Sequence, residues 1–481
     1  MKSLPATGSP SEDVLAALTD LTAHDVDWRS GRAFAYVYDA GREIDALAER
    51  AMAALHKENA LDPTVFPSLR QIQGDLVAMV ASHLNGGPES GGTVTSGGTE
   101  SIMLAVKTAR DRARAAGREG SLEVVLPSTA HPAHIKACQY LGLEPVVVDV
   151  DPATYRAIPS ALAAAITERT VLLVGSAPSY PHGVVDPIEA IGAVAVDAGV
   201  PLHVDACVGG WLLPYWRRLG ADVPAFDLSV PGVTSVSVDL HKYAFCPKGV
   251  SVLVHRDRAE AWAHQCFTWS GWAGYTLINP NVLSTRSGGP LAGAWAVLHH
   301  LGDAGYLALA EGLRETTRRL TEGLAAINGV EVLAEPDLCL IAFRSTEVSP
   351  FHVADEMRLR GWYVQVQLGH HGLPNNLHLS VLPAHAPHVE AFLAALRESV
   401  LAAADLPDPM PVPEAVEAIA GMLAGGLDAA GFEALLAGAG AVDGALPERV
   451  APIHALLAAL PDSGAEALIT AFFGELLAPS V

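Results

Sequence analysis

The segments Pro201-Leu-His-Val-Asp-Ala206 and Ser237-Val-Asp-Leu-His-Lys-Tyr243 decide the fold, because each is a β-rich run that ends in polar side chains. Similar apolar runs recur between about residues 93 and 255, separated by segments with helical patterns. Runs of Val and Leu without polar alternation are typical of strands buried on both faces. The sequence therefore predicts an α/β domain with a large, mostly parallel sheet and helices on each side.

The strands of this sheet are expected at 122–127, 145–150, 170–175, 201–206, 235–239 and 250–255. A helix is expected at 99–115, with Ile102, Val106 and Ala109 on one apolar stripe. Functional groups in such sheets gather where strands end, and His131, Asp205 and Lys242 all follow expected strands. These three residues are the candidate catalytic set.

Lys242 follows a β-rich run, has His241 before it, and lies 37 residues after Asp205. A lysine in this setting is what a pyridoxal phosphate Schiff base requires, and the same cofactor needs a carboxylate on its pyridine nitrogen. We therefore predict that Lys242 binds the cofactor and that Asp205 pairs with its ring. Burial and cations such as His241 or Lys248 are expected to lower the pKa of Lys242.

The segment Thr95-Ser-Gly-Gly-Thr-Glu-Ser101 is a glycine turn that opens a helix. The backbone N–H groups of Gly97, Gly98 and Thr99, together with the threonine hydroxyl, are expected to point at the cofactor phosphate near the positive helix end. Ser237 is also placed among the cofactor-binding residues. The ring of His131 is expected on the cofactor face, although an ordinary loop histidine is a fair rival interpretation.

Composition and charge limit the possible partners. The chain has 481 residues, half of them hydrophobic, and a net charge of −23 from 30 basic and 53 acidic residues. This acidity disfavours nucleic acid and anionic membranes, so small molecules are the expected partners. The cysteines lack a CxxC pair, and no signal peptide or membrane-spanning stretch is visible, so a cytoplasmic location is expected.

Four regions are expected along the chain: an N-terminal segment at 1–60, a large cofactor-binding domain at 61–290, a small C-terminal α/β domain at 291–401, and an Ala-, Gly- and Leu-rich helical appendage at 402–481. The small domain should open with a helix at 291–302 and contain a strand at 338–344. The appendage, with a short helix at 432–439, shows no visible chemistry and is expected to cover the small domain or an oligomer surface.

Other site classes find little support. Close histidine pairs occur, but none stands in an HExxH arrangement or beside paired cysteines, so no metal site is expected. The chain also lacks a GxSxG nucleophile turn and a Rossmann GxGxxG, which leaves hydrolase and dehydrogenase interpretations without a motif.

The strings TSGGTES, STAHPAHIKA, PHGVVDPI, HVDACVGGW and VDLHKYAFCPKG resemble the group II pyridoxal phosphate-dependent decarboxylase family, and within it the sphingosine-1-phosphate lyases, from about residue 31 to about residue 400. The resemblance implies fold type I, the transferase-like fold of such enzymes, and a homodimer with active sites near the subunit interface. It also implies that His131 stacks on the cofactor ring, that His241 joins Gly98 and Thr99 at the phosphate, and that Tyr38 and Lys248 face the substrate.

Two departures from the lyase pattern concern the substrate. Asp62 stands where the lyases carry a histidine that helps to hold the substrate phosphate, and Leu277 stands where they carry a tyrosine. A carboxylate at position 62 would repel a phosphate. The expected function is therefore a carbon–carbon lyase that decarboxylates an unphosphorylated amino acid. Retro-aldol cleavage of a phosphorylated long-chain base, an aminotransferase and a degenerate, non-enzymatic scaffold are the alternatives.

Overall fold

The computed structural model describes residues 3–23, 25–274, 277–424 and 447–478. Its central element is a seven-stranded sheet with the order β1-β7-β6-β5-β4-β2-β3. The strands are β1 (Gly91–Thr95), β2 (Glu123–Pro127), β3 (Glu144–Val148), β4 (Thr170–Ser176), β5 (Leu202–Asp205), β6 (Val233–Asp239) and β7 (Ser251–His255). Only β7 runs antiparallel to its neighbours, so the predicted mostly parallel sheet is confirmed.

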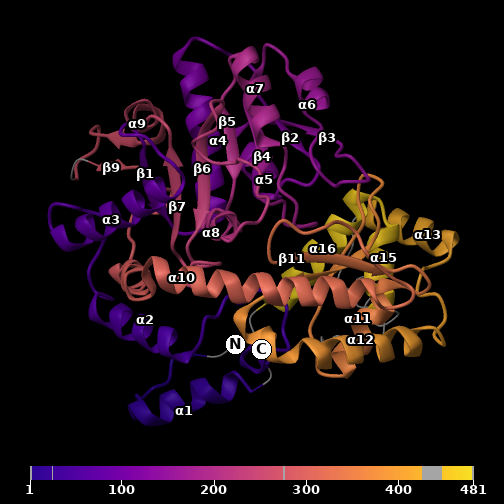
Figure 1. Ribbon diagram of the computed structural model, residues 1–481. Coiled ribbons are helices and arrows are strands. Elements are labelled where there is room, and N and C mark those ends of the chain that lie inside the picture. The colour runs from indigo at the N-terminus through magenta and orange to yellow at the C-terminus, as the bar shows by residue number, and fades with distance from the viewer. Residues whose placement is uncertain (1–2, 24, 275–276, 425–446, 479–481) are drawn as a thin grey trace.

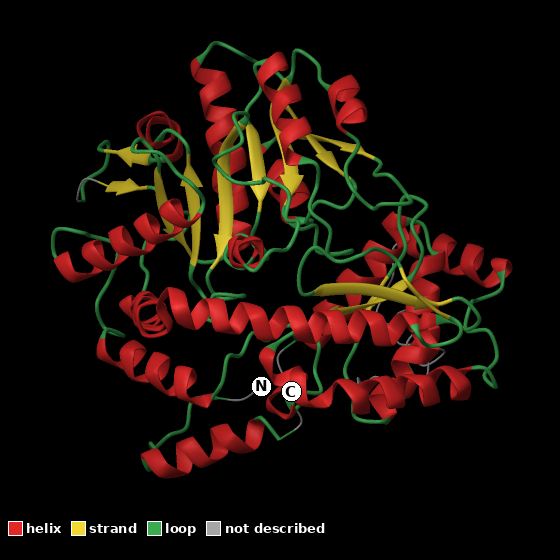
Figure 2. Ribbon diagram, in the orientation of Figure 1, coloured by secondary structure: helices red, strands yellow, loops and turns green. Residues whose placement is uncertain are grey.

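Both faces of this sheet are buried, and the alternation of side chains along the strands shows it. Val125 and Leu173 join the hydrophobic cluster of α7 (Ile188–Ala198), whereas Val124 and Leu172 join the cluster of α4 (Gly98–Ala115) on the opposite face. Because successive residues of a strand point to opposite faces, each strand needs apolar residues at nearly every position. Figure 2 shows the sheet with its covering helices.

Further helices surround the large sheet (Figure 1). They are α3 (Pro67–His83), α5 (Ala133–Leu141), α6 (Pro159–Ala165), α8 (Leu213–Arg218) and α9 (Arg258–Gln265). The helix α2 (Arg42–Ala54) packs instead against α10 (Gly288–Ala325), and α1 (Ser11–Leu21) buries none of its residues. The short strands β8 (Phe267–Trp269) and β9 (Leu277–Asn279) form a separate hairpin. The six predicted strands are present with small shifts at their ends. The sequence analysis did not predict β1, whose two opening glycines gave no apolar run.

A second, antiparallel sheet has the order β10-β11-β13-β12. Its strands are β10 (Val330–Val332), β11 (Leu340–Ser345), β12 (Gln365–Gln367) and β13 (Asn376–Ser380), and its helices are α10 (Gly288–Ala325), α11 (Pro350–Leu359) and α12 (Val389–Ala403). The predicted helix at 291–302 lies within α10, which continues beyond a non-helical Gly302 and runs beneath both sheets (Figure 1). The predicted strand at 338–344 corresponds to β11.

The C-terminal region is helical in its described part, with α13 (Pro413–Ala424), α15 (Ala451–Ala459) and α16 (Asp462–Leu476). Ala451 and Ala455 of α15 pack against Phe351 of α11. The helix predicted at 432–439 lies outside the described residues. The four predicted region boundaries stay predictions. Within the described part of the chain, no helix has the length and apolar character needed to cross a membrane.

Candidate active site

A cavity of about 560 Å³ lies where β4, β5 and β6 end and α4 begins. It brings together all of the site residues predicted from the sequence except Ser237 and Asp62. The residues assembled are Tyr38, Gly97, Gly98, Thr99, His131, Asp205, His241, Lys242 and Lys248. Parallel strands place their carboxyl ends at one sheet edge, which is why segments far apart in sequence meet here.

Lys242 lies in the turn directly after β6, with its Nζ 2.8 Å from Oδ2 of Asp239. Burial by itself would lower the pKa of Lys242, but the Asp239 carboxylate outweighs burial and raises that pKa above its usual range. The expectation of a lowered pKa is therefore wrong in this structure. Asp239 is itself held by the Ser251 hydroxyl, which donates to its Oδ1 at 2.5 Å.

Asp205 ends β5 and is buried, with 8% of its surface exposed. Its Oδ1 accepts hydrogen bonds from the Cys207 N–H at 3.1 Å and from the Ser237 hydroxyl at 3.4 Å. Burial would raise the pKa of Asp205, but His134, His131 and Lys242 lower it to about 2. Asp205 is thus an ionised carboxylate at neutral pH, as pairing with a cationic ring requires.

The glycine turn leaves room at the start of α4. A Cβ on Gly98 would lie 2.7 Å from Sγ of Cys207 and 2.9 Å from Oδ2 of Asp239, so no other residue fits without displacement. Gly97 has an extended backbone, and a Cβ there would meet only His241 at 3.8 Å. The first N–H groups of a helix have no intrahelical partner and are therefore free for an anion.

His131 lies in the loop between β2 and α5, at an exposed position on the cavity wall. Its Nδ1 accepts the N–H of Ala133 at 3.1 Å, which fixes the orientation of the ring. Its carbonyl oxygen lies 3.0 Å from Nδ1 of the fully buried His134.

One part of the cavity wall carries Tyr36, Tyr38, Tyr180 and Lys248. Lys248 donates from Nζ to the carbonyl oxygen of Tyr36 at 3.1 Å, and its Nζ lies 5.1 Å from the Tyr38 ring centre. Tyr36 has a φ of 68°, a left-handed conformation that turns this carbonyl toward the lysine. Among the described residues, no carboxylate forms an ion pair with Lys248, so its charge remains available to a ligand.

Two predicted residues lie elsewhere. Asp62 is exposed outside the cavity, where its Oδ1 accepts from the N–H of Thr64 at 2.8 Å and from its hydroxyl at 2.6 Å. The structure therefore places its charge outside the cavity that holds Tyr38 and Lys248. Ser237 is fully buried and does not line the cavity, but its hydroxyl donates to the Asp205 carboxylate at 3.4 Å and so supports that side chain.

Sequence reasoning missed several residues of the cavity wall, among them Asp239, Cys207 and Tyr180. Asp239 lies in the segment Ser237–Tyr243, three residues before Lys242. Residues three apart in a turn after a strand can contact each other, so this spacing could have indicated the ion pair. Cys207 and Tyr180 gave no signal, because only the folded chain brings them to the cavity.

The arrangement fits pyridoxal phosphate on three observations. The cavity offers a primary amine at Lys242, a buried ionised carboxylate at Asp205, and a helix start kept open by Gly98. These are the groups that an aldehyde, a pyridine nitrogen and a phosphate require. Within the described ranges, no cluster of His, Cys, Asp and Glu side chains is arranged to hold a metal ion.

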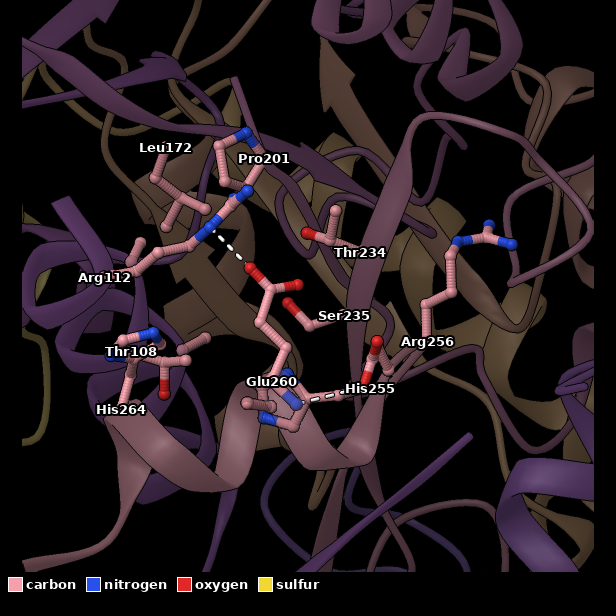
Figure 3. Close-up of a pocket in the computed structure, with 14 residues that line it drawn as sticks. Thr108, Arg112, Leu172, Pro201, Thr234, Ser235, His255, Arg256, Glu260 and His264 are labelled. Atoms are coloured by element: carbon pink, nitrogen blue, oxygen red, sulfur yellow. Dashed lines mark hydrogen bonds and ion pairs between the residues drawn. The ribbon is translucent and has the colours of Figure 1, made fainter. Parts of the chain in front are cut away.

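A second, smaller pocket lies between α4 and α9 and contains none of the predicted site residues (Figure 3). The ion pair between Arg112 Nε and Glu260 Oε1, at 2.6 Å, spans it. Burial lowers the pKa of His255 on its wall to about 4, so that imidazole is neutral at neutral pH.

Two family models match this chain. The family model described as the pyridoxal-dependent decarboxylase conserved domain matches residues 2–346. A second model, for a C-terminal helix–turn–helix domain of pyridoxal-dependent enzymes, matches residues 413–475.

Several similar proteins are described as sphingosine-1-phosphate lyases. The sphingosine-1-phosphate lyase of Dictyostelium discoideum is 36% identical over 398 residues, covering 82% of this chain and 74% of the relative. That of Arabidopsis thaliana is 37% identical over 432 residues, covering 88% and 76%. The solved structure of a Burkholderia pseudomallei sphingosine-1-phosphate lyase has a TM-score of 0.80 and 36% identity, covering 84% of this chain and 93% of that one. A Lactobacillus brevis glutamate decarboxylase, with a TM-score of 0.75 and 20% identity over 85% of this chain and 96% of its own, shares the fold.

Proposed function

Because this chain belongs to the pyridoxal-dependent decarboxylase family, we propose that it is an aldehyde lyase that cleaves the carbon–carbon bond between the amine and hydroxyl carbons of a phosphorylated long-chain amino alcohol. A pyridoxal phosphate-dependent lyase is what the family and the relatives show. The phosphorylated substrate is the proposal. It replaces the amino-acid decarboxylase that the sequence analysis favoured.

The observation that carries the proposal is the position of Lys248. Its ammonium group lines the cavity without a carboxylate partner among the described residues, donates to the main-chain carbonyl of Tyr36 and lies over the ring of Tyr38. A cation and hydroxyl donors are the groups that recognise a phosphate monoester. Asp62, the one residue that opposed a phosphate, lies outside this cavity.

The chain's own groups divide the work. Bound pyridoxal phosphate would supply an electron sink for the bond that breaks. Lys242 would hold the cofactor until the substrate amine displaces it. Asp205 would keep a proton on the pyridine nitrogen. Gly97, Gly98, Thr99 and His241 would hold the cofactor phosphate, and His131 would cover the ring.

Decarboxylation of an amino acid remains the second candidate, because the matched family is named for that reaction. Lys248 could bind an acidic substrate group as well as a phosphate, so the cavity does not oppose it. An aminotransferase would use the same cofactor groups, but no comparison supports it.

One experiment separates these reactions. Purified, cofactor-loaded protein is incubated with sphingosine-1-phosphate, with sphingosine, and with a panel of amino acids, while long-chain aldehyde, carbon dioxide and keto acid consumption are measured. We expect aldehyde from the phosphorylated base, with a kcat/KM at least about a hundredfold above that for sphingosine. Carbon dioxide from an amino acid without aldehyde would overturn the proposal in favour of decarboxylation.

The proposed function also bears on the partners and the location of the protein. A homodimer, a cytoplasmic location and a small-molecule amine substrate stay predictions. Nucleic acid remains an unsuitable partner, because residues 413–475, which match the helix–turn–helix model, contain nine acidic residues and only one basic residue, Arg449.

A further inference from the structure

Buried polar atoms without hydrogen-bond partners gather behind the active-site cavity. Among the described residues, both ring nitrogens of His182 and of His378, and the hydroxyls of Ser179 and Ser380, are buried and complete no hydrogen bond of good geometry, although the His378 ring lies close enough to the Tyr180 main chain to have its pKa raised by it. All four side chains are at most 3% exposed. Buried polar groups in folded proteins almost always have a partner, so this concentration indicates an occupant.

These side chains face one another from two elements. His378 and Ser380 alternate along β13, so they share one face of the small sheet, and Gln365 of β12 lies opposite His378 on that face. Ser179 and His182 come from the segment after β4 of the large sheet. We call the region between Ser179, His182, His378 and Ser380 the polar seam.

The chemistry of the polar seam selects water as its occupant. Burial lowers the pKa of His182 to about 4 and that of His378 to about 3, so both rings are neutral at physiological pH. A neutral imidazole offers one donor and one acceptor, and a hydroxyl offers both. These groups satisfy water molecules, which need two to four polar partners, whereas a phosphate would need a cation.

The polar seam reaches the cavity through two tyrosines. Tyr180 lines the cavity, its ring centre lies 4.5 Å from that of His378, and its hydroxyl donates to Oε1 of Gln365 at 2.6 Å. The Ser380 hydroxyl lies close enough to lower the pKa of both Tyr38 and Tyr180, although it completes a hydrogen bond of good geometry with neither. Ser380 is therefore the junction between the cavity and the seam.

We propose that ordered water molecules fill the polar seam and that, through Ser380, they exchange protons with Tyr38 and Tyr180 while the substrate is cleaved. This inference rests on the proposed function. Cleavage of the substrate breaks the O–H bond of its hydroxyl group and the C–C bond between its hydroxyl and amine carbons, and it forms a C=O bond at the hydroxyl carbon. The hydroxyl proton leaves, the C–C electron pair stays with the amine-bearing fragment, and that fragment takes up one proton. The proton count is unchanged, so the relay holds a proton and returns it.

The tyrosines act in this relay as neutral hydroxyls. Burial raises the pKa of Tyr38 to about 12, although Lys242 opposes that shift, so Tyr38 stays protonated at neutral pH. A neutral phenol passes a proton by donating its own to Ser380 as it accepts another from the substrate. Tyr38 is thus a shuttle and needs no ionised resting state.

The test uses the cofactor-loaded protein and the variants Ser380→Ala and His378→Phe. A crystal structure at a resolution that orders waters should show water bonded to His378 and His182. Both variants should lower kcat for aldehyde release at least about tenfold, leave KM and the visible cofactor absorption unchanged, and enlarge the solvent isotope effect in D₂O. The matched control is His352→Phe, which removes a buried histidine of α11 that bonds the Pro407 carbonyl, away from the seam.

Each outcome decides the proposal. A dry seam, or variants with the kcat and isotope effect of the native protein, would overturn it. Thermal melting checks that the variants fold, and Ser380→Ala, which only removes a hydroxyl, keeps the test valid if His378→Phe unfolds. If the native protein releases no aldehyde, the proposed function fails and so does the relay, whereas the crystal structure still decides the presence of water.

Discussion

At the scale of single residues, Lys242 and Asp239 form the closest charge pair of the cavity. The 2.8 Å contact keeps the Lys242 ammonium protonated, although only a neutral amine can attack an aldehyde. Asp239 therefore positions the lysine and at the same time slows its reaction with the cofactor.

Lys242→Ala should abolish the visible absorption of bound pyridoxal phosphate and nearly all turnover, because it removes the amine that lies beside Asp205 and the glycine turn. Lys248→Ala is the matched control. It should retain the absorption and raise KM for a phosphorylated substrate at least about tenfold, since it removes a cation from the substrate side. Absorption lost in Lys248→Ala and kept in Lys242→Ala would reverse the assignment.

Asp239→Asn should speed attachment of pyridoxal phosphate at neutral pH. The carboxylate raises the pKa of Lys242, so its removal lowers that pKa and increases the neutral fraction of the amine. The measurement is the rate of cofactor attachment from pH 6 to pH 9, and the pH dependence should move to lower pH in the variant. An unmoved profile would show that Asp239 does not control this ionisation.

At the scale of elements, the start of α4 is determined by its neighbours rather than by helix propensity. Gly98 lies against Cys207 at the end of β5 and Asp239 at the end of β6, so the helix approaches the sheet at a distance that excludes any Cβ. This contact brings the helix N-terminus to the cavity.

Gly98→Ala should therefore weaken pyridoxal phosphate binding by at least about tenfold, because its Cβ would displace Cys207 or Asp239. Gly97→Ala is a matched control one residue away, where the backbone is extended and the nearest atom is 3.8 Å from the added carbon. Spectroscopic titration of both apoproteins measures the effect. Equal affinities in the two variants would contradict the close-contact argument.

Two buried carboxylates of α11 help to attach the C-terminal helices to the small sheet unit. Asp355 of α11 accepts the N–H of Val450 at 3.1 Å and that of Ala451 at 2.8 Å, at the start of α15. Arg449 adds an ion pair with Glu356 at 2.5 Å. The Asp355 carboxylate thus holds the described part of the appendage at the N-terminus of α15. Free N–H groups at a helix N-terminus favour a negative charge.

Asp355→Ala should loosen residues 447–478, at a cost of about 2 kcal/mol for the lost charged hydrogen bonds. Hydrogen exchange of α15 and α16 is the readout, and we expect faster exchange there than in α11. Arg358→Ala is the control, because Arg358 pairs with Asp355 but bonds no group of α15. Unchanged exchange in Asp355→Ala would mean that apolar packing alone holds these helices.

At the scale of the whole molecule, burial of neutral histidines links stability to pH. Burial lowers the pKa of His182, His255 and His385 to about 4 and that of His203 and His378 to about 3. In the unfolded chain these groups take up protons near pH 6.5. Between these values the unfolded state binds more protons than the folded state, so acidification favours unfolding.

The free energy of unfolding should therefore fall as pH decreases from about 6.5 toward 4. His255→Gln should make that decline shallower by up to about 1.4 kcal/mol per pH unit, because one proton-binding difference is removed. Urea unfolding at several pH values measures the slope, with His300→Gln at an exposed position as the control. A slope equal to that of the native protein would show that His255 does not contribute.

The sequence by itself determined the large sheet and the place where the candidate cofactor-binding residues Asp205 and Lys242 meet. Runs of Val and Leu are typical of strands covered on both faces, and Asp205 and Lys242 follow two of the expected strands at positions that a parallel sheet brings to one edge. It could not reveal β1, whose glycines lack an apolar pattern.

Only the tertiary structure decided which charges meet. Asp62 was judged from its place along the chain, but local hydrogen bonds to Thr64 hold it at the surface, outside the cavity. Asp239 lies against Lys242 and reverses its expected pKa shift, and the polar seam arises because the face of β13 that carries His378 meets the segment after β4. Electrostatic effects depend on distances of a few ångströms between segments remote in sequence, and those distances exist only once the two sheets have packed.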